Sequence, residues 1–224
     1  LHSTYFSLFA TYFGIVAIKK EKSSIWFWTS LFLCLAFFSK QVPAGYTIVV
    51  MSIFVLFLTF KEKNIYIILY YAAGALFFLS LLFIFLILNK ISIYDFILQI
   101  FLFPSSIGSN RYETYSLEFK NIFIDYKFIY IIFFTLIILN IRKYFNNKKF
   151  DIKNLNIFLL LSIIVVTSIF HQIYTKNQIY IFFLIPICSG FVIYFNDLKK
   201  KNLKNFVDFF VILICVFTTF KYNE

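Results

Sequence analysis

The chain has 224 residues, of which 62% are hydrophobic and 24% aromatic, and its mean hydropathy is +0.86. Soluble domains are about 45–50% apolar, so this composition excludes a soluble globular protein and predicts a multi-pass membrane protein. The formal net charge is +11, but the basic residues lie in short connections between apolar runs. Such connections face anionic lipid, so the charge does not indicate a nucleic-acid partner.

Eight apolar runs predict an all-α transmembrane bundle of about eight spans. A helix needs about 20 residues to cross the hydrocarbon, and the shorter runs need flanking residues that reach into the headgroups. The runs occupy residues 3–18, 25–39, 43–60, 65–88, 127–141, 155–171, 178–195 and 206–220. We expect one transmembrane domain over residues 1–224. Because Leu1 is not an initiator methionine and no signal-peptide n-region follows, we expect an N-terminal part to be missing.

The basic residues alternate from one connection to the next. If the N-terminus is outside, the inner connections are residues 19–24, 61–64, 142–154 and 196–205, and they hold fourteen of the 21 Lys and Arg residues. Cytoplasmic loops carry such an excess, so this alternation predicts the orientation. We expect a multi-pass protein of the cell (inner) membrane whose active face is extracytoplasmic.

One outer connection, residues 89–126, is much longer than the others, and long loops tend to be functional. Its first part, "NKISIYDFILQIFLFP", places Ser92, Asp95 and Gln99 at i, i+3 and i+7. This spacing predicts a helix over 91–103 that lies in the membrane interface and ends at Pro104. The alternative is a short ninth membrane element. A polar stretch, "PSSIGSNRYETYSLEF", follows and carries Arg111, Glu113 and Glu118.

The stretch "LAFFSKQVPAGY" places a single lysine, Lys40, between two apolar runs. It falls at the outer end of the second run, and Pro43 falls in the first turn of the third, a position that suits proline. A lysine beside the unpaired N–H groups and positive dipole end of a helix start predicts an anion site facing outward. The alternative is a lysine that extends to the headgroups and satisfies the last carbonyls of the second helix.

A second outer hairpin, "HQIYTKNQIYIFFLIP", contains His171, Gln172 and Lys176. Each short outer hairpin thus offers a lysine and a glutamine, opposite a long loop that contains Arg111. Together they predict a shared anionic ligand at the outer membrane surface. Taken alone, His171 fits a satisfied interface histidine better than a catalytic residue.

The sequence has no motif for a cofactor or a metal. Cys34, Cys188 and Cys215 lie inside apolar runs without C-x-x-C spacing, which indicates small buried side chains. No Gly-rich phosphate loop, H-E-x-x-H, G-x-S-x-G or zinc spacing is present. We therefore expect no cofactor and no metal.

These stretches resemble the multi-spanning glycosyltransferases of the GT-C class, which include protein O-mannosyltransferases and the aminoarabinose transferases of lipid A. In that class a span ends in a pattern like "LAFLTKQ", which "LAFFSKQ" matches here. A later K-x-x-x-Y-x-x-x-x-x-P opens a span, and Lys176, Tyr180 and Pro186 match it. The stretch "YDFILQIFLFPSSIGSNRY" is similar to the outer loop between these landmarks. The resemblance covers nearly the whole chain.

The resemblance implies transfer of a sugar from a polyprenyl-phosphate donor to a glycan, lipid or protein acceptor at the outer face. We expect Lys40, Gln41 and Lys176 to bind the donor phosphate. Further substrate contacts are expected from the following residues: Arg111, His171, Gln172, Tyr180 and Asp95. The resemblance also implies a catalytic carboxylate in a first outer loop that nothing in this sequence matches, so the catalytic residue is unknown.

Two other functions remain open from the sequence. An O-antigen polymerase or ligase also has many spans and one long outer loop, but it relies on outer arginines, and only Arg111 is present. A membrane transporter or channel would place ionisable or Gly/Pro-broken segments near the bilayer midplane. Here Pro186 is the only mid-span proline, Gly74 and Gly190 are isolated, and Asp208 lies near the inner end of its span.

Overall fold

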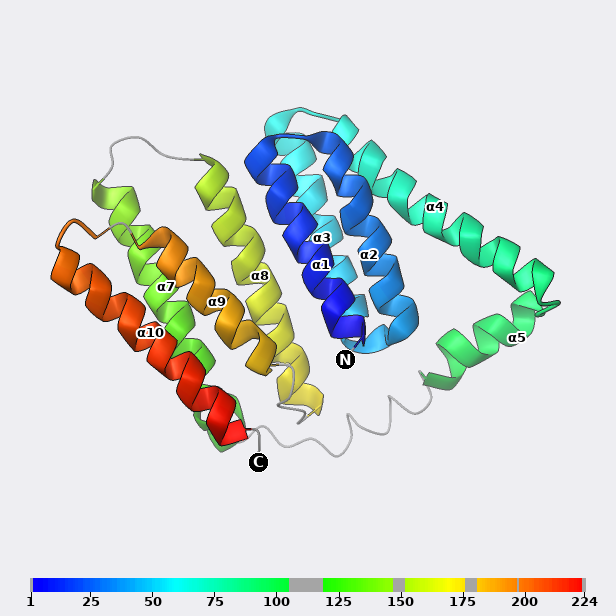
Figure 1. Cartoon of the computed structure of the whole chain (residues 1–224). Helices are drawn as coiled ribbons and strands as arrows, with labels where there is room; N and C mark the ends of the chain where they lie inside the picture. Colours follow the sequence, from blue (N-terminus) through cyan, green and yellow to red (C-terminus); the bar gives the residue numbers. More distant parts are fainter. Residues whose placement is uncertain (1, 105–118, 147–151, 176–180, 197, 223–224) are drawn as a thin grey trace. The chain divides into compact units, whose positions relative to one another are not determined.

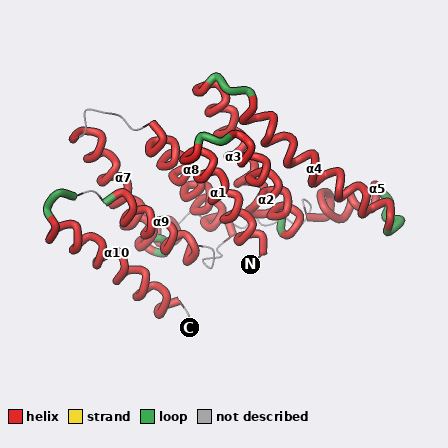
Figure 2. Tube along the Cα trace, turned by 45° about the horizontal axis from the view of Figure 1, so that its top comes forward, coloured by secondary structure: helices red, strands yellow, loops and turns green. Residues whose placement is uncertain are grey.

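The computed structural model describes residues 2–104, 119–146, 152–175, 181–196 and 198–222. Within these ranges every regular element is helical and no strand is present (Figures 1 and 2). The elements are α1 (His2–Lys20), η1 (Ser23–Ile25), α2 (Trp26–Ser39), α3 (Gln41–Glu62), α4 (Tyr66–Leu88), α5 (Ile93–Ile97), η2 (Leu98–Leu102), η3 (Lys120–Ile124), α7 (Lys127–Asn146), α8 (Ile152–Thr175), α9 (Ile181–Phe195) and α10 (Lys201–Tyr222).

The predicted all-helical fold is confirmed, because each of the eight apolar runs is helical where it is described, except for Ile65 at the start of the fourth run. Among the described residues, four helical stretches are long and apolar enough to cross a membrane: Gln41–Glu62, Tyr66–Leu88, Ile152–Ile173 and Lys201–Lys221. They indicate a membrane protein. At about 1.5 Å per residue, the 14 residues of α2 extend about 21 Å, less than a hydrocarbon core of about 30 Å. The count of eight spans therefore stays a prediction.

The chain divides into two compact units. Unit 1 comprises Leu1–Ser116 and Leu159–Thr167, and unit 2 comprises Leu117–Phe158 and Ser168–Glu224. The middle of α8 thus groups with the first four helices and its two ends group with α7, α9 and α10. The single transmembrane domain expected from the sequence stays a prediction.

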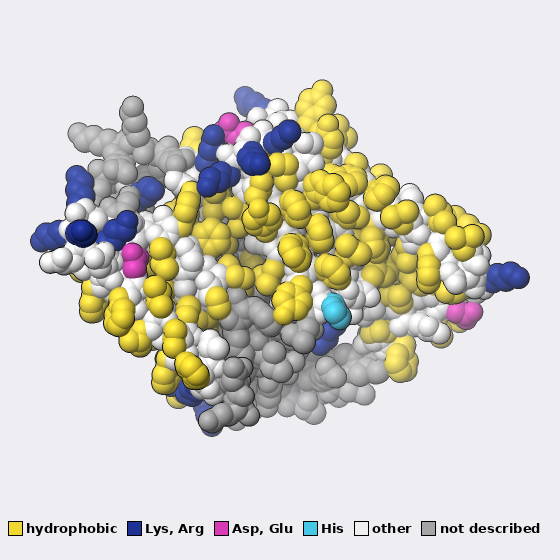
Figure 3. Space-filling model, in the orientation of Figure 1, with side chains coloured by type: hydrophobic (Ala, Val, Ile, Leu, Met, Phe, Trp, Pro, Cys, Tyr) yellow, Lys and Arg dark blue, Asp and Glu magenta, His cyan; other side chains and the backbone are white. Residues whose placement is uncertain are grey.

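In unit 1, α2 packs against α1, α3 and α4. Its buried stripe includes Thr29, Leu33 and Ala36, at a spacing of three or four residues, which places these side chains on one face of the helix. The rings of Phe13 and Phe32 stack with centroids 5.4 Å apart and join α1 to α2. Many apolar side chains of the outer faces remain exposed, as expected of helices that face lipid (Figure 3).

A hydrogen bond joins α3 and α4 in unit 1, where the Ser52 Oγ and Tyr71 hydroxyl oxygens are 3.0 Å apart. We expect Tyr71→Phe to lower the free energy of unfolding in mixed micelles by about 0.6 kcal/mol and at most by about 1.7 kcal/mol, the range for hydrogen bonds between membrane helices. Tyr70→Phe is the matched control, because Tyr70 is 41% exposed on the same helix. Equal effects of the two changes would contradict a role for this bond.

In unit 2, α9 packs against α7 and α10. Ile129, Ile132 and Leu136 form the buried stripe of α7, at i, i+3 and i+7. On α9 the buried side chains Ile185, Cys188 and Val192 follow the same spacing. Cys188 is buried as the sequence predicted. The repeated i, i+3, i+7 spacing is the pattern by which helices bury one face.

Candidate functional site

The two ends of unit 1 differ in charge. At one end the side-chain amide nitrogen of Asn64 donates to Oγ of Ser23 at 3.1 Å and joins the α1–α2 connection to the α3–α4 connection. Figure 3 shows the basic side chains gathered over this end. The two connections and the helix ends next to them contain Lys19, Lys20, Lys22, Lys61 and Lys63. The two connections that the sequence assigns to the cytoplasm thus lie at the same end of unit 1.

Lys40 lies at the opposite end, between α2 and α3. Its backbone is extended (φ −165°, ψ 114°), its N–H donates to the carbonyl of Ala36 at 3.0 Å, and its own carbonyl accepts from Oγ of Ser3 at 3.1 Å. Val42 is not helical, so the regular helix starts at Pro43 and the predicted start of this run is confirmed. The Lys40 side chain is exposed. The backbone on both sides of the lysine is therefore held by hydrogen bonds while its side chain reaches the surface.

Gln41 joins this hairpin to the long connection. Its side-chain amide nitrogen donates to the carbonyl of Ile100 in η2. Two aromatic contacts support the same placement, with ring centroids 5.9 Å apart for Phe37 and Phe101 and 6.0 Å apart for Phe38 and Phe96. Residues 93–102 therefore pack on the end of α2 beside Lys40. We call the Lys40–Gln41 hairpin end together with residues 93–102 the rim of unit 1.

The helix predicted over 91–103 is confirmed from Ile93 onward, with an α-helical part, α5, followed by the π-helical turn η2, whereas Ile91 and Ser92 are not helical. Ser92, Asp95 and Gln99 are exposed, whereas Phe96 and Ile100 are half-buried. Phe103 and Pro104 are still helical, so the end of this helix lies outside the described residues. Its position in the membrane interface stays a prediction.

The rim can bind an anion. The exposed residue Lys40 stands next to a helix whose regular part begins at Pro43, and the first N–H groups of a helix have no acceptor within it. The amide of Gln41 uses one donor on Ile100 and retains a second hydrogen. Asp95 is on the same rim, and a carboxylate accepts hydrogen bonds from hydroxyl groups rather than binding phosphate. Cationic and hydroxyl-binding groups therefore occur together on the rim.

The other predicted site residues are not brought to this rim by any described contact. Arg111, Lys176 and Tyr180 lie outside the described residues. His171 and Gln172 are in the part of α8 that belongs to unit 2, and both are buried. Neither atom of the Gln172 amide has a hydrogen-bond partner in the described part of the chain. Within that part, no three His, Cys, Asp or Glu side chains are grouped as metal ligands.

Sequence reasoning missed Ser3 and Ile100, the two residues that fix the backbone and the amide of the Lys40–Gln41 pair. No local signal marks either residue, because the bonds connect positions 37 and 59 residues apart. Sequence reasoning also missed that α2 approaches α4 closely at Gly74, where a Cβ would overlap the carbonyl oxygen of Phe27. The small residues "AAGA" at 72–75 were a signal for such a contact. Small residues in a span indicate a close helix–helix contact.

No family model matches the chain, and comparisons with curated proteins and with solved structures gave no significant match. The resemblance to GT-C glycosyltransferases rests on the residues quoted above.

The orientation is tested by labelling single cysteines in a background where the three native cysteines are replaced by alanine. We expect Asn110→Cys and Asn177→Cys to react with an impermeant maleimide added from outside, because positive-inside loops alternate with outer ones. Asn147→Cys and Asn202→Cys should react only after permeabilisation. Reaction of the latter pair in intact cells would contradict the orientation.

Proposed function

We propose that this chain is the donor-binding membrane part of a GT-C-like glycosyltransferase, which transfers a sugar from a polyprenyl-phosphate donor to an acceptor at the extracytoplasmic face. In this proposal the chain spans the membrane about eight times. The observation that carries the proposal is the Gln41–Ile100 hydrogen bond, because it connects the Lys40–Gln41 hairpin to the long connection 89–126. This contact lies at one end of unit 1, and the lysine-rich α1–α2 and α3–α4 connections lie at the other end.

The chemistry of such a donor fits the rim. The donor's lipid tail remains in the bilayer, and its phosphate becomes an anionic leaving group when the sugar is transferred. A cation near the membrane boundary stabilises that developing charge, and it does so more strongly where water is scarce. The Lys40 ammonium and the N–H groups that follow Pro43 supply this stabilisation.

The segment 93–102 supplies the wall beside the phosphate. Its exposed apolar residues include Tyr94, Ile97 and Phe101, which can line the polyprenyl chain. Its exposed polar residues, Asp95 and Gln99, are suited to sugar hydroxyls. A segment that carries both kinds of side chain fits a lipid-linked sugar, whose tail is apolar and whose head is polar.

Photo-crosslinking of the protein in nanodiscs tests the proposal. A polyprenyl phosphate with a diazirine on the isoprene unit next to the phosphate should label peptides that contain residues 37–46 and 93–102. A polyprenol with the same diazirine and no phosphate is the control and should label these peptides much less. Labelling of both peptides to the same extent by the two probes, or labelling confined to residues 19–24 and 61–64, would overturn the proposal.

A further inference from the structure

A second basic region lies in unit 2, at the junction of α9 and α10. Asn196 organises it, because its side-chain nitrogen donates to Oδ1 of Asp208 at 2.8 Å and to the carbonyl of Lys204 at 3.1 Å. Asn196 is only 3% exposed. A buried amide with two hydrogen bonds to the first turns of α10 fixes where that helix starts. The lysines next to the junction therefore project from an ordered backbone.

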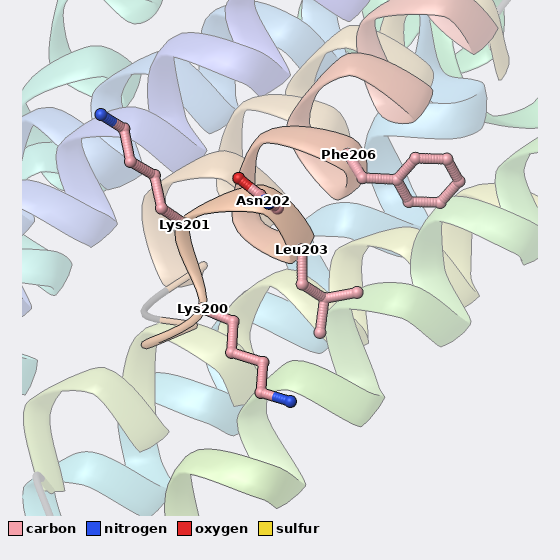
Figure 4. A pocket seen from close by; sticks show the side chains of 5 residues that line it. All are labelled: Lys200, Lys201, Asn202, Leu203 and Phe206. Atoms are coloured by element: carbon pink, nitrogen blue, oxygen red, sulfur yellow. The ribbon is translucent and has the colours of Figure 1, made fainter.

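An open cleft of about 570 Å³ lies at the start of α10 and is lined by Lys200, Lys201, Asn202, Leu203 and Phe206. Figure 4 shows Lys200 and Leu203 extending to the same side, with Phe206 farther along the helix, whereas Lys201 extends the other way. Leu203 and Phe206 are three residues apart on α10, a spacing that makes them neighbours on the helix surface, and Lys200 directly precedes this helix. The cleft therefore has a cationic end and an apolar wall.

The apolar wall continues along α10. Leu203, Phe206 and Phe210 are 42%, 63% and 41% exposed, and the rings of Phe206 and Phe210 stack with centroids 6.4 Å apart. The candidate membrane span in this helix starts at Lys201, so Lys200 lies at headgroup depth when that span is inserted. Asp208 is held by Asn196 and is not among the residues that line the cleft.

We propose that this cleft binds an anionic phospholipid, with its phosphate against Lys200 and one acyl chain along Leu203, Phe206 and Phe210. Charge complementarity identifies the occupant, because among the described residues the cleft is lined by two lysines and no acidic side chain, and Lys199 and Lys204 are close to these lysines in the sequence. The order of side chains, cation first and then apolar residues toward the membrane interior, matches the order of groups in a phospholipid. This lipid site does not depend on the proposed transferase activity.

The test titrates dioleoylphosphatidylglycerol into the full chain in a zwitterionic detergent and counts bound lipids by native mass spectrometry. Dioleoylphosphatidylcholine is the neutral comparison. We expect the wild type to bind phosphatidylglycerol more tightly, and Lys200→Gln to weaken that binding about fivefold, since one lysine near anionic lipid contributes about 1 kcal/mol. Lys200→Arg, which keeps the charge, should restore most of the binding.

The matched control is Lys20→Gln, because Lys20 is an exposed lysine on the same predicted membrane side and is not among the residues that line this cleft. It should leave the first bound phosphatidylglycerol unchanged. Equal losses in Lys20→Gln and Lys200→Gln would mean diffuse attraction to basic loops and would overturn the site. Equal affinity of the wild type for phosphatidylglycerol and phosphatidylcholine would also overturn the site. Circular dichroism of each variant confirms that its helices are intact.

Discussion

Replacing Lys40 by glutamine is expected to weaken the binding of polyprenyl phosphate about tenfold to a hundredfold. A charge-assisted contact at a partly desolvated site contributes about 1.5–3 kcal/mol, and each 1.4 kcal/mol corresponds to about tenfold in affinity. Lys40→Arg should be milder because it keeps the charge, although the planar guanidinium is bulkier at a hairpin held by Ser3 and Ala36. The measurement is the dissociation constant of polyprenyl phosphate for the purified protein.

The control for this prediction is Lys120→Gln, which removes one exposed lysine from the same predicted membrane side in unit 2. It should leave the affinity within about twofold of the wild-type value. If Lys40 only extends to the headgroups and supports the end of α2, Lys40→Gln will bind polyprenyl phosphate normally and accumulate to a lower level in the membrane. Binding per folded molecule separates these two outcomes.

Replacing Gly74 by alanine is expected to give the largest loss of stability. A Cβ at this position would stand 2.1 Å from the carbonyl oxygen of Phe27 and 2.3 Å from Oγ of Ser30. The first of these atoms is backbone, so α2 and α4 would have to move apart. Overpacking of this kind costs about 1–3 kcal/mol, and a larger side chain, as in Gly74→Leu, should prevent unit 1 from folding.

Gly190→Ala is the matched control for this change, because in the described part of the chain no heavy atom other than those of its own helix backbone and chain neighbours lies within 4 Å of where its Cβ would stand. Alanine favours a helix over glycine by about 1 kcal/mol, so Gly190→Ala should be neutral or slightly stabilising. The free energy of unfolding in mixed micelles, measured for both variants, distinguishes the two sites. A Gly74→Ala variant as stable as Gly190→Ala would contradict the close packing of α2 and α4.

The helices could be predicted from the sequence because each depends on a local signal. An apolar run that ends at lysines marks α1, an apolar run with a lysine on each side marks α3, and Pro43 marks the residue where the regular part of α3 begins. The π-helical turn over Leu98–Leu102 could not be predicted, because the stripe of Ser92, Asp95 and Gln99 fits an ordinary helix equally well. The division into two units could not be predicted either, since it depends on side-chain packing between distant segments.

The candidate site could be predicted in part. A lone lysine between apolar runs marked Lys40 as a candidate, because a charge inside an apolar run is costly, and the structure places Lys40 at an exposed helix end. The hydrogen bonds of Ser3 and Gln41 could not be found, since nothing in a sequence indicates which distant carbonyl a side chain will reach. The burial of His171 and Gln172 could not be predicted either, because a polar pair after an apolar run fits a surface or an interior equally well.

The central claim is that the chain binds the phosphate of a polyprenyl donor at the rim of unit 1. The most direct test compares polyprenyl phosphate with polyprenol of the same length in nanodiscs of phosphatidylcholine, for the wild type, Lys40→Gln and Lys200→Gln. The account predicts at least a tenfold preference for the phosphate in the wild type and in Lys200→Gln, and loss of that preference in Lys40→Gln. Equal affinity of the wild type for the two lipids, or a preference lost only in Lys200→Gln, would contradict it.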